Sequence, residues 1–399
     1  MNQIELSFIV LATISVAGFM LVRQSGRGPL PYVAAFVAYM GLGPVINYLM
    51  GVPIYFGVVT EYIPAAARGY LLAVGGLLIA SSLSRPSRAP KQLEDGVEWS
   101  RRYGFLIGIL LALSAVYAGA IIATKGPSLL GTNKLVALTS VGSLHYPYLL
   151  AELILAACYL LIRASPRVSR IFWINIGIYV VYCLVTSERD FVLVLVALAM
   201  QSRNQHGGPR LLATVGAAVI GAVFATGLFV VRGGDAGPSL LAGVLGQGSL
   251  LFVDTQVLNY VPQYEPYAWG STYLDSGFSA VGLGAWASRG SLAEWLVDIY
   301  APGSSGGYGF SMIAEVTMNF SQWGILPAFL LLGVVITRLT KTSGNSAFAA
   351  FMKVFLVVFV PYMLRSDSVG LFSGVVSAIL FFVFLSVFTK GETTAARED

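Results

Sequence analysis

Long runs of apolar residues, separated by short polar segments, occupy the chain as far as about position 389. A transmembrane helix needs roughly 20 predominantly apolar residues. The pattern therefore predicts an all-α polytopic integral membrane protein with about 11 transmembrane helices. The predicted helices cover residues 4–22, 29–50, 63–83, 103–123, 144–162, 171–187, 188–203, 211–231, 311–337, 347–364 and 368–389.

The basic residues orient these helices. Most of the 24 Lys and Arg residues fall in the loops on one predicted side, for example around Arg85, Arg163 and Arg203. Cytoplasmic loops carry an excess of Lys and Arg. We therefore expect the N-terminus outside the membrane and residues 390–399 as a cytoplasmic tail.

One predicted outer loop is much longer than the others. It divides the chain into helices 1–8 in residues 1–231, the loop in residues 232–310, and helices 9–11 in residues 311–389. Long loops are usually functional, and aromatic rings can stack on sugar faces. An interfacial aromatic belt accounts for part of the same set. The aromatic residues are Tyr260, Tyr264, Tyr267, Trp269, Tyr273, Trp286, Trp295, Tyr300 and Tyr308.

Composition excludes several other classes of protein. Only 11% of the residues are charged, against about 25% in soluble domains. Cys158 and Cys183 lie within apolar runs, so no disulfide framework is expected. His145 and His206 are far apart, and the sequence has neither a zinc-ligand cluster nor a P-loop. The basic residues follow the predicted topology, so no nucleic-acid partner is implied.

The charges of Glu188, Arg189 and Asp190 interrupt an apolar stretch, so Arg189 would lie at or below the outer interface. Ionisable residues at membrane depth are costly and usually functional. The alternative is a tight turn whose charges reach water. Glu188 and Asp190 would then pair with Arg189 and offset its desolvation.

Three further arginines lie on the predicted outer side. Arg232 ends a helix, where a snorkelling C-terminal cap is the alternative. Arg365 lies in the last outer hairpin, where a surface pair with Asp367 is the alternative, and Arg289 lies in the long loop, where a charge is ordinary. Because guanidinium groups bind phosphate oxygens bidentately, Arg189 and these three residues predict a diphosphate site.

Glu315 is the acidic candidate for chemistry. It lies in the first turns of a predicted helix, with Ser311 and Asn319 four residues before and after it on the same face. A carboxylate in apolar surroundings has a raised pKa, which suits a general base. The alternative role is a helix N-terminal acid that stabilises the helix dipole.

The C-terminal half, from about residue 171, resembles the Wzy-type O-antigen polymerases, which join oligosaccharide repeat units. The central motif runs from Gly309 to Glu315 and continues through Asn319-Phe320 to Gly324. Four further motifs agree with that family: Ser187-Glu188-Arg189, Arg232-Gly233-Gly234, Gly270-Ser271-Thr272-Tyr273 and Arg365-Ser366-Asp367.

The resemblance implies a metal-independent, cofactor-free glycosyltransferase of the membrane C-type (GT-C) superfamily in the bacterial inner membrane, with its active site on the periplasmic side. Its donor and acceptor would be undecaprenyl-diphosphate-linked glycans of lipopolysaccharide biosynthesis, and a chain-length regulator is a candidate partner. Glu315, Arg189 and Arg232 would be catalytic. The residues expected to bind substrate are Arg289, Arg365, Tyr308, Ser311, Asn319, Asp235 and Tyr273.

Two alternatives share these features. An O-antigen ligase would transfer the glycan to lipid A core, and a transporter would move lipid-linked sugar across the membrane. Related ligases carry a functional histidine near this outer helix start, and residues 305–324 contain none, which favours a polymerase. The general base stays open, with Asp235, Asp254, Asp275, Tyr308 and His145 as candidates beside Glu315.

Overall fold

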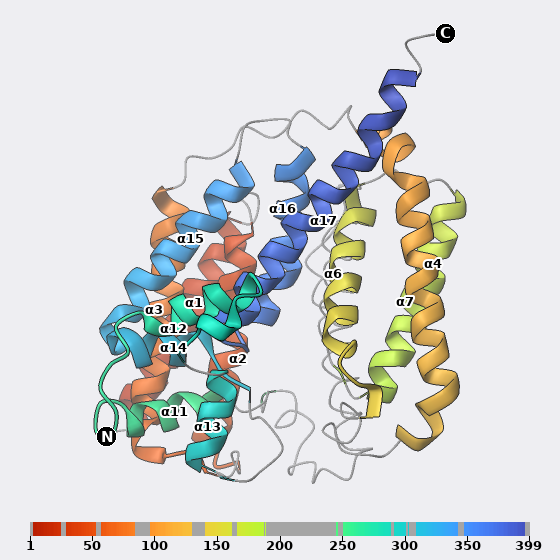
Figure 1. Cartoon of the computed structure of the whole chain (residues 1–399). Helices are drawn as coiled ribbons and strands as arrows, with labels where there is room; N and C mark the ends of the chain where they lie inside the picture. Colours follow the sequence, from red (N-terminus) through yellow and green to blue (C-terminus); the bar gives the residue numbers. More distant parts are fainter. Residues whose placement is uncertain are drawn as a thin grey trace. The chain divides into compact units, whose positions relative to one another are not determined.

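A computed structural model provides the structure, and all the regular elements that it describes are helices (Figure 1). The described part of the structure leaves out residues 189–249, apart from Leu245, and several shorter segments. The described residues are 3–24, 29–52, 57–83, 96–129, 140–161, 166–186, 188, 245, 250–288, 291–300, 302, 309–341 and 347–395.

The chain forms two compact units. The first unit comprises Met1–Arg88, Ala236–Thr342 and Val360–Val376. Its long helices pack side by side, with α3 in contact with α1, α2 and α15. Their bounds are Gln3–Gln24 for α1, Leu30–Leu49 for α2, Ile63–Leu83 for α3 and Ile325–Lys341 for α15.

Helices α3 and α15 approach closely because glycine lines their contact. A Cβ atom at Gly76 would lie 2.6 Å from the carbonyl oxygen of Leu326, and one at Gly333 would lie 2.5 Å from Cβ of Ala80. In a membrane, small residues at helix contacts allow dispersion contacts between backbones. The contact therefore depends on the missing side chains at these two positions.

The first unit also contains short helical elements, some of them from the long predicted loop. One cluster of buried apolar residues, from α11, α13, α14 and the segment before α14, includes Phe252, Leu296 and Phe310. The short elements are η1 Thr60–Tyr62, α11 Leu250–Tyr260, α12 Ser271–Ala280, η2 Gly284–Trp286, α13 Leu292–Tyr300, α14 Met312–Phe320 and η3 Gln322–Gly324.

The second unit contains Ala89–Asp235, Ser343–Phe359 and Ser377–Asp399. Helix α4 packs against α6 and α7 in this unit. Helices α16 and α17 contribute residues to both units. The bounds are Gly96–Leu129 for α4, His145–Leu161 for α6, Pro166–Thr186 for α7, Ala347–Met363 for α16 and Ser368–Ala395 for α17.

Within the described residues, 7 helices are long and apolar enough to cross a membrane. This agrees with a polytopic membrane protein. Two other predicted spans correspond to the shorter helices α6 and α16, and the predicted spans 188–203, apart from Glu188, and 211–231 lie outside the described residues. The candidate spans are Gln3–Arg23, Leu30–Leu49, Thr60–Leu83, Tyr103–Leu129, Arg167–Thr186, Gln322–Leu339 and Ser368–Val387.

The predicted continuous helix over residues 311–337 is wrong. Ser321 adopts a φ of 62°, and it separates α14 from η3 and α15. A left-handed residue cannot continue a right-handed helix. The apolar pattern continues across this position, so hydropathy alone does not detect the break. Only Gln322–Leu339 meets the length and composition of a span.

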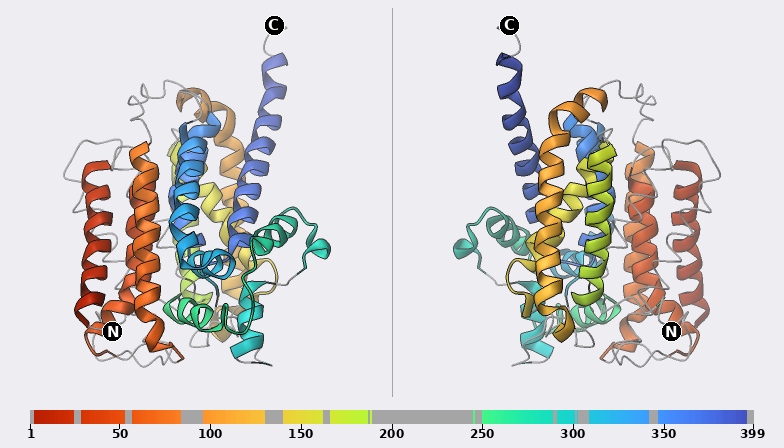
Figure 2. Two further views of the ribbon diagram at one scale, coloured as in Figure 1. Left: turned by 90° about the vertical axis from the view of Figure 1, so that its left-hand side faces the viewer. Right: turned by 90° about the vertical axis from the view of Figure 1, so that its right-hand side faces the viewer.

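The segment predicted as a large outer loop contributes α11, α12, η2 and α13. We call Ser271–Trp286, which comprises α12, the following turn and η2, the α12 hairpin. Figures 1 and 2 share a vertical axis, and in both the hairpin lies level with the middle of α3 rather than beyond its end. Helices α11 and α13 lie level with the end of α3 from which Thr60–Tyr62 leads into it.

Candidate functional site

Helix α14 begins at a well-formed cap. The hydroxyl of Ser311 accepts hydrogen bonds from the backbone N–H groups of Ile313 and Ala314, each at 3.1 Å. Serine is a favoured N-cap because its oxygen satisfies free N–H groups of the first turn. Gly309, two residues earlier, has a φ of 75°, which glycine adopts without strain. This start fixes the direction of α14 and of the carboxylate of Glu315.

The carboxylate of Glu315 is fully buried and accepts three hydrogen bonds. Its Oε1 accepts from the hydroxyl of Thr272 at 2.8 Å and from the hydroxyl of Ser368 at 2.6 Å. Its Oε2 accepts from the backbone N–H of Ser368 at 2.6 Å. Three segments that are distant in sequence, the starts of α12 and α17 and the helix α14, therefore meet at one carboxylate.

Asn319 connects the loop before α12 to α14. Its Oδ1 accepts from the backbone N–H of Gly270 at 2.7 Å, and its Nδ2 donates to the Thr272 hydroxyl at 2.7 Å and to the carbonyl of Glu315 at 2.8 Å. Gly270 has a φ of 93°. The amide therefore orients Thr272 toward Glu315, so in this structure Asn319 acts on the carboxylate through its neighbours.

Burial sets the protonation of Glu315. Desolvation raises its pKa to about 7, and the hydrogen bonds from Ser368 and Thr272 offset part of that effect. Burial disfavours the charged carboxylate, whereas donors favour it. A carboxyl group with this pKa can gain and lose a proton near neutral pH, as a general base must.

A cavity of about 200 Å³, lined by both polar and apolar residues, lies beside this network. Thr272 and Ser276 line it, and the Ser276 hydroxyl lies 2.7 Å from that of Ser368. Glu315 itself does not line it. The carboxylate therefore reaches the cavity through hydroxyl groups. The lining residues are Thr272, Asp275, Ser276, Ser279, Gly284, Ala287, Ser291, Leu292 and Val369.

Asp275 supports the wall of this cavity. Its two carboxylate oxygens accept from the backbone N–H and the hydroxyl of Ser288, each at 2.8 Å. These bonds join α12 to the segment that follows η2. Asp275 is nearly buried, at 9% exposure, and both of its oxygens are hydrogen-bonded.

A second buried carboxylate lies on α11. Asp254 accepts a hydrogen bond from the hydroxyl of Tyr70 on α3. Desolvation raises the pKa of Asp254 to about 6, while hydrogen bonds from Tyr70 and Ser311 act in the opposite direction. The cap residue of α14 thus connects the Asp254 pair to the helix that carries Glu315.

Two other predicted residues lie near the Glu315 network. Tyr273 follows Thr272, stacks on Phe320 with ring centroids 6.2 Å apart, and has a pKa raised by burial and by the charge of Glu315. Arg365 is half-buried three residues before Ser368. Its backbone oxygen would lie 3.7 Å from a Cβ atom at Gly309. The structure therefore brings the 309–319 and 365–368 motifs together.

Five predicted site residues lie outside the described part of the structure: Arg189, Arg232, Asp235, Arg289 and Tyr308. The other five predicted site residues lie within the described part of the structure: Tyr273, Ser311, Glu315, Asn319 and Arg365.

The sequence reasoning missed three hydroxyls that surround Glu315 or its cavity: those of Thr272, Ser276 and Ser368. Thr272 and Ser276 are four residues apart, which places them on one face of α12. The four-residue spacing could have indicated this pair from the sequence alone. For Ser368 the sequence offers no indication beyond its position after the Arg365-Ser366-Asp367 motif.

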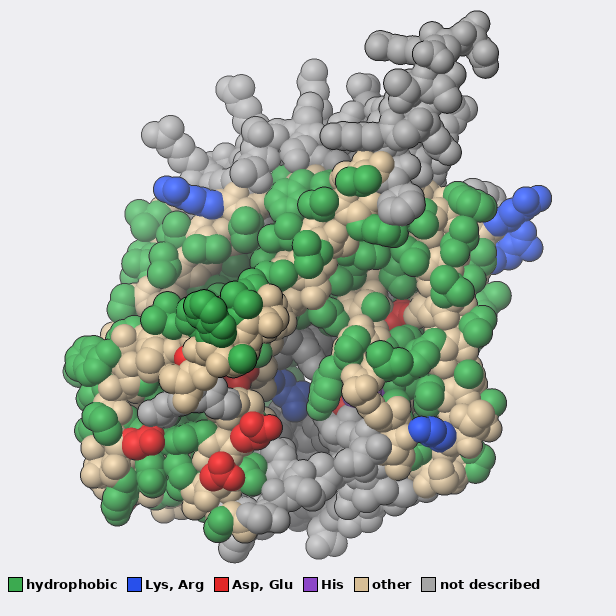
Figure 3. Space-filling view, in the orientation of Figure 1, with side chains coloured by type: hydrophobic (Ala, Val, Ile, Leu, Met, Phe, Trp, Pro, Cys, Tyr) green, Lys and Arg blue, Asp and Glu red, His purple; other side chains and the backbone are tan. Residues whose placement is uncertain are grey.

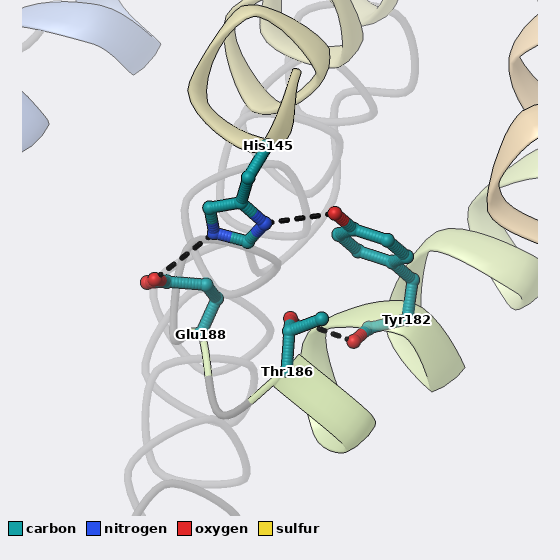
Figure 4. A network of polar contacts seen from close by, with 4 residues as sticks. All are labelled: His145, Tyr182, Thr186 and Glu188. Atoms are coloured by element: carbon teal, nitrogen blue, oxygen red, sulfur yellow. Dashed lines mark hydrogen bonds and ion pairs between the residues drawn. The ribbon is translucent and has the colours of Figure 1, made fainter. Parts of the chain in front are cut away.

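The second unit holds a separate buried network (Figure 4). The Nδ1 atom of His145 lies 2.8 Å from the hydroxyl of Tyr182, and its Nε2 atom lies 3.2 Å from Oε1 of Glu188. His145 and Glu188 are both buried. These contacts connect His145, the first residue of α6, to Glu188, which follows the end of α7 closely in sequence.

A further carboxylate lies deeper among the same helices. Glu152 on α6 accepts from Nδ2 of Asn175 at 2.8 Å and from the hydroxyl of Ser114 on α4. Hydrogen bonds between membrane helices contribute modestly to their association. Within the described residues, no group of three or more His, Cys, Asp and Glu side chains could hold a metal ion.

Together these observations describe a membrane protein whose described regular elements are all helices and whose buried Glu315 carboxylate lies next to a cavity. A model of the family described as O-antigen polysaccharide polymerase Wzy matches residues 191–395, just over half of the 399-residue chain. The chain belongs to this family, which confirms the resemblance found in the sequence. No curated protein and no solved structure matches the chain.

Proposed function

We propose that the protein polymerises undecaprenyl-diphosphate-linked repeat units by moving the growing glycan as a block onto another lipid-linked unit. The observation that carries this proposal is the buried Glu315 network, whose hydroxyl groups line a neighbouring cavity, within the part of the chain that matches the Wzy family. The reaction releases undecaprenyl diphosphate and belongs to a GT-C-type glycosyltransferase that needs no metal.

The acceptor sugar occupies the cavity with one hydroxyl next to Ser276. A serine hydroxyl has one proton to donate. When Glu315 is ionised, Ser368 donates to it and accepts from Ser276, so a proton can pass from the acceptor through two hydroxyls to the carboxylate. The distances of 2.7 Å and 2.6 Å along this route support a relay.

The acceptor oxygen forms a bond to the anomeric carbon of the donor glycan. The bond between that carbon and the diphosphate oxygen breaks, and its electron pair leaves with the diphosphate. The proton of the acceptor hydroxyl ends on Glu315. Stabilisation of the leaving charge is usually a large part of such catalysis, and we assign it to Arg189, Arg232, Arg289 and Arg365.

The remaining predicted residues have supporting roles in this proposal. Tyr273 and Tyr308 contact sugar, Asp235 binds its hydroxyls, and Ser311 and Asn319 hold α14 and Thr272 in position. The site faces the periplasm in an inner-membrane protein whose N-terminus lies outside and whose C-terminus is cytoplasmic. A chain-length regulator is a candidate partner.

The direct experiment compares Glu315→Gln with Glu315→Asp in liposomes that contain a synthetic diphosphate-linked repeat unit. Gln keeps the shape but takes up no proton, so we expect a loss of about 100-fold or more, as for removal of a general base. Asp keeps the base and should retain part of the activity. Products are separated as a ladder on a gel.

The control is Glu294→Gln, which changes an exposed acid on α13 and should leave the ladder intact. A normal ladder from Glu315→Gln would exclude the relay. A product that forms only when lipid A core is added would identify a ligase instead. Reporter fusions near Tyr264 and Pro90 test the orientation, with outside and inside as the respective expectations.

A further inference from the structure

The α12 hairpin has two chemically different faces. Polar residues at Thr272, Asp275, Ser276 and Ser279 recur at helical spacing and line the cavity. The opposite face is apolar and exposed. Its exposed side chains are Leu274 at 67%, Phe278 at 36%, Val281 at 58%, Leu283 at 46% and Trp286 at 73%.

The exposed face carries no charge. Between Glu265 and Arg289 the only ionisable acid or base among Asp, Glu, Lys, Arg and His is Asp275, which is nearly buried and hydrogen-bonded to Ser288. Hydrophobic side chains gather over α12 in Figure 3, whereas acidic side chains lie over the region of α13. A water-facing loop surface would normally mix charges with its apolar residues.

Five backbone N–H groups at and next to the tip of the hairpin donate to carbonyls within the hairpin. Val281 donates to the carbonyl of Gly277 at 3.3 Å, and Leu283 donates to that of Phe278 at 2.8 Å. Gly282, Trp286 and Ala287 also donate to nearby carbonyls within the hairpin. Exposed backbone in hydrocarbon requires such internal partners, because no water is present to replace them.

The height of the hairpin agrees with this chemistry. It lies level with the middle of α3, a candidate span, in both views of Figure 2. Trp323 of η3 and Leu331 of α15, both within the candidate span Gln322–Leu339, are exposed as well, at 83% and 64%.

We propose that the α12 hairpin is a re-entrant element whose apolar face is inserted among lipid acyl chains. Its occupant is the bilayer itself, which covers Leu274, Phe278, Val281 and Trp286. Amphipathic helices bind membranes in this way, with the apolar face in lipid and the polar face turned away. Here the polar face turns toward the protein cavity instead of toward water.

In this placement the hairpin separates the lipid from the cavity. If the proposed polymerase function holds, on which only this step rests, a substrate can keep its polyprenyl tail in the bilayer beside the hairpin. Its sugar then lies on the side of Thr272 and Ser276. The insertion itself is independent of catalysis and is tested without activity.

The test uses fluorescence quenching in full-length protein reconstituted in liposomes. Cys158 and Cys183 are replaced by Ala, and Leu274→Cys, Val281→Cys and Trp286→Cys are labelled one at a time with bimane. Lipids brominated in mid-chain report contact with acyl chains, and iodide reports contact with water. We expect bromolipid to reduce the fluorescence at all three positions and iodide to have little effect.

Glu294→Cys on α13 is the matched control, since it replaces an exposed charged residue and should respond to iodide. Iodide quenching of Val281→Cys equal to that of Glu294→Cys, without bromolipid quenching, would overturn the proposal. Gel filtration shows whether each labelled protein is folded. If one variant aggregates, the same two quenchers applied to the other two positions still decide the result.

A failed polymerase assay with normal bromolipid quenching would reject the proposed reaction and keep the inserted hairpin. Normal polymerisation with iodide quenching at the hairpin would do the reverse. Val281→Lys and Val281→Leu give a second comparison. Lysine at an acyl-chain position should lower the amount of folded protein in the membrane, whereas leucine should not.

Discussion

Ser368 donates to both carboxylate oxygens of Glu315, through its hydroxyl to Oε1 and through its backbone N–H to Oε2, each at 2.6 Å. Ser368 is also the first residue of α17. The start of a helix carries partial positive charge and free N–H groups, which favour an anion there. The contact therefore orients Glu315 and stabilises its ionised form.

Ser368→Ala should separate these two effects. Alanine keeps the backbone N–H but removes the hydroxyl that joins Ser276 to Glu315. We expect a fall in polymerisation rate with little change in thermal stability, because the carboxylate keeps two donors. Ser366→Ala is the control, since its hydroxyl contacts Asp367 at 3.4 Å and not Glu315. Equal rates from Ser368→Ala and wild type would exclude the hydroxyl relay.

The pH dependence follows from the raised pKa of Glu315. The carboxyl group must lose its proton to act as a base, so activity should rise as pH passes through about 7. Ser368→Ala removes a donor that lowers this pKa, so the midpoint should move to higher pH. Initial rates measured from roughly pH 5 to 9, on both sides of the expected midpoint, check both expectations. A flat profile would contradict them.

Stability should change in the opposite direction. Between the ordinary value of 4.5 and about 7, folded Glu315 keeps a proton that the unfolded chain has lost. The free energy of unfolding therefore falls as pH rises through this window. Asp254, with a pKa raised to about 6, acts in the same direction. Thermal unfolding of Glu315→Gln should show a weaker pH dependence than that of wild type.

The chemical motifs of this site were more predictable than its shape. Glu315 is singled out by its position in a predicted helix and Arg365 by its predicted outer position, the family resemblance agrees with both, and the structure joins their neighbourhoods through Ser368. The break at Ser321 could not be predicted, because hydropathy is blind to a single left-handed residue. The insertion proposed for the α12 hairpin could not be predicted either, because its polar face lowers its hydropathy and topology rules treat everything between spans as a loop.

The contact between α3 and α15 can be tested with adjacent glycines. A Cβ at Gly76 would meet backbone atoms of Leu326 and Leu330 at 2.6 and 2.8 Å, whereas a Cβ at Gly75 would have nothing within 4 Å. Both changes to alanine gain the same helix propensity. Gly76→Ala should be less stable than Gly75→Ala by about 1–3 kcal/mol, the usual cost of overpacking. Thermal unfolding in detergent measures the difference, and equal midpoints would refute the close contact.

The arginines assigned to the diphosphate make a prediction that does not depend on Glu315. Arg189→Ala and Arg232→Ala should each reduce polymerisation by about 100-fold or more, as expected for loss of a preorganised charge-stabilising donor. Lysine should rescue poorly, because it lacks the bidentate fork. Arg68→Ala, at an exposed position on α3, is the control. Normal ladders from both alanine variants would remove these residues from the chemistry.

The His145–Glu188 pair gives the last prediction. Both side chains are buried and lie 3.2 Å apart, so His145→Ala leaves the Glu188 carboxylate without this partner. Removing one hydrogen-bond partner of a buried polar group commonly costs about 1–3 kcal/mol. The double variant with Glu188→Ala should be destabilised by less than the sum of the two single changes, because each single change already removes the contact between the two side chains. Additive changes in thermal unfolding would show that the two side chains are not coupled.

Because Glu188 precedes Arg189, His145→Ala should also lower polymerisation, and His145→Asn, which keeps a hydrogen-bond donor, should restore part of it.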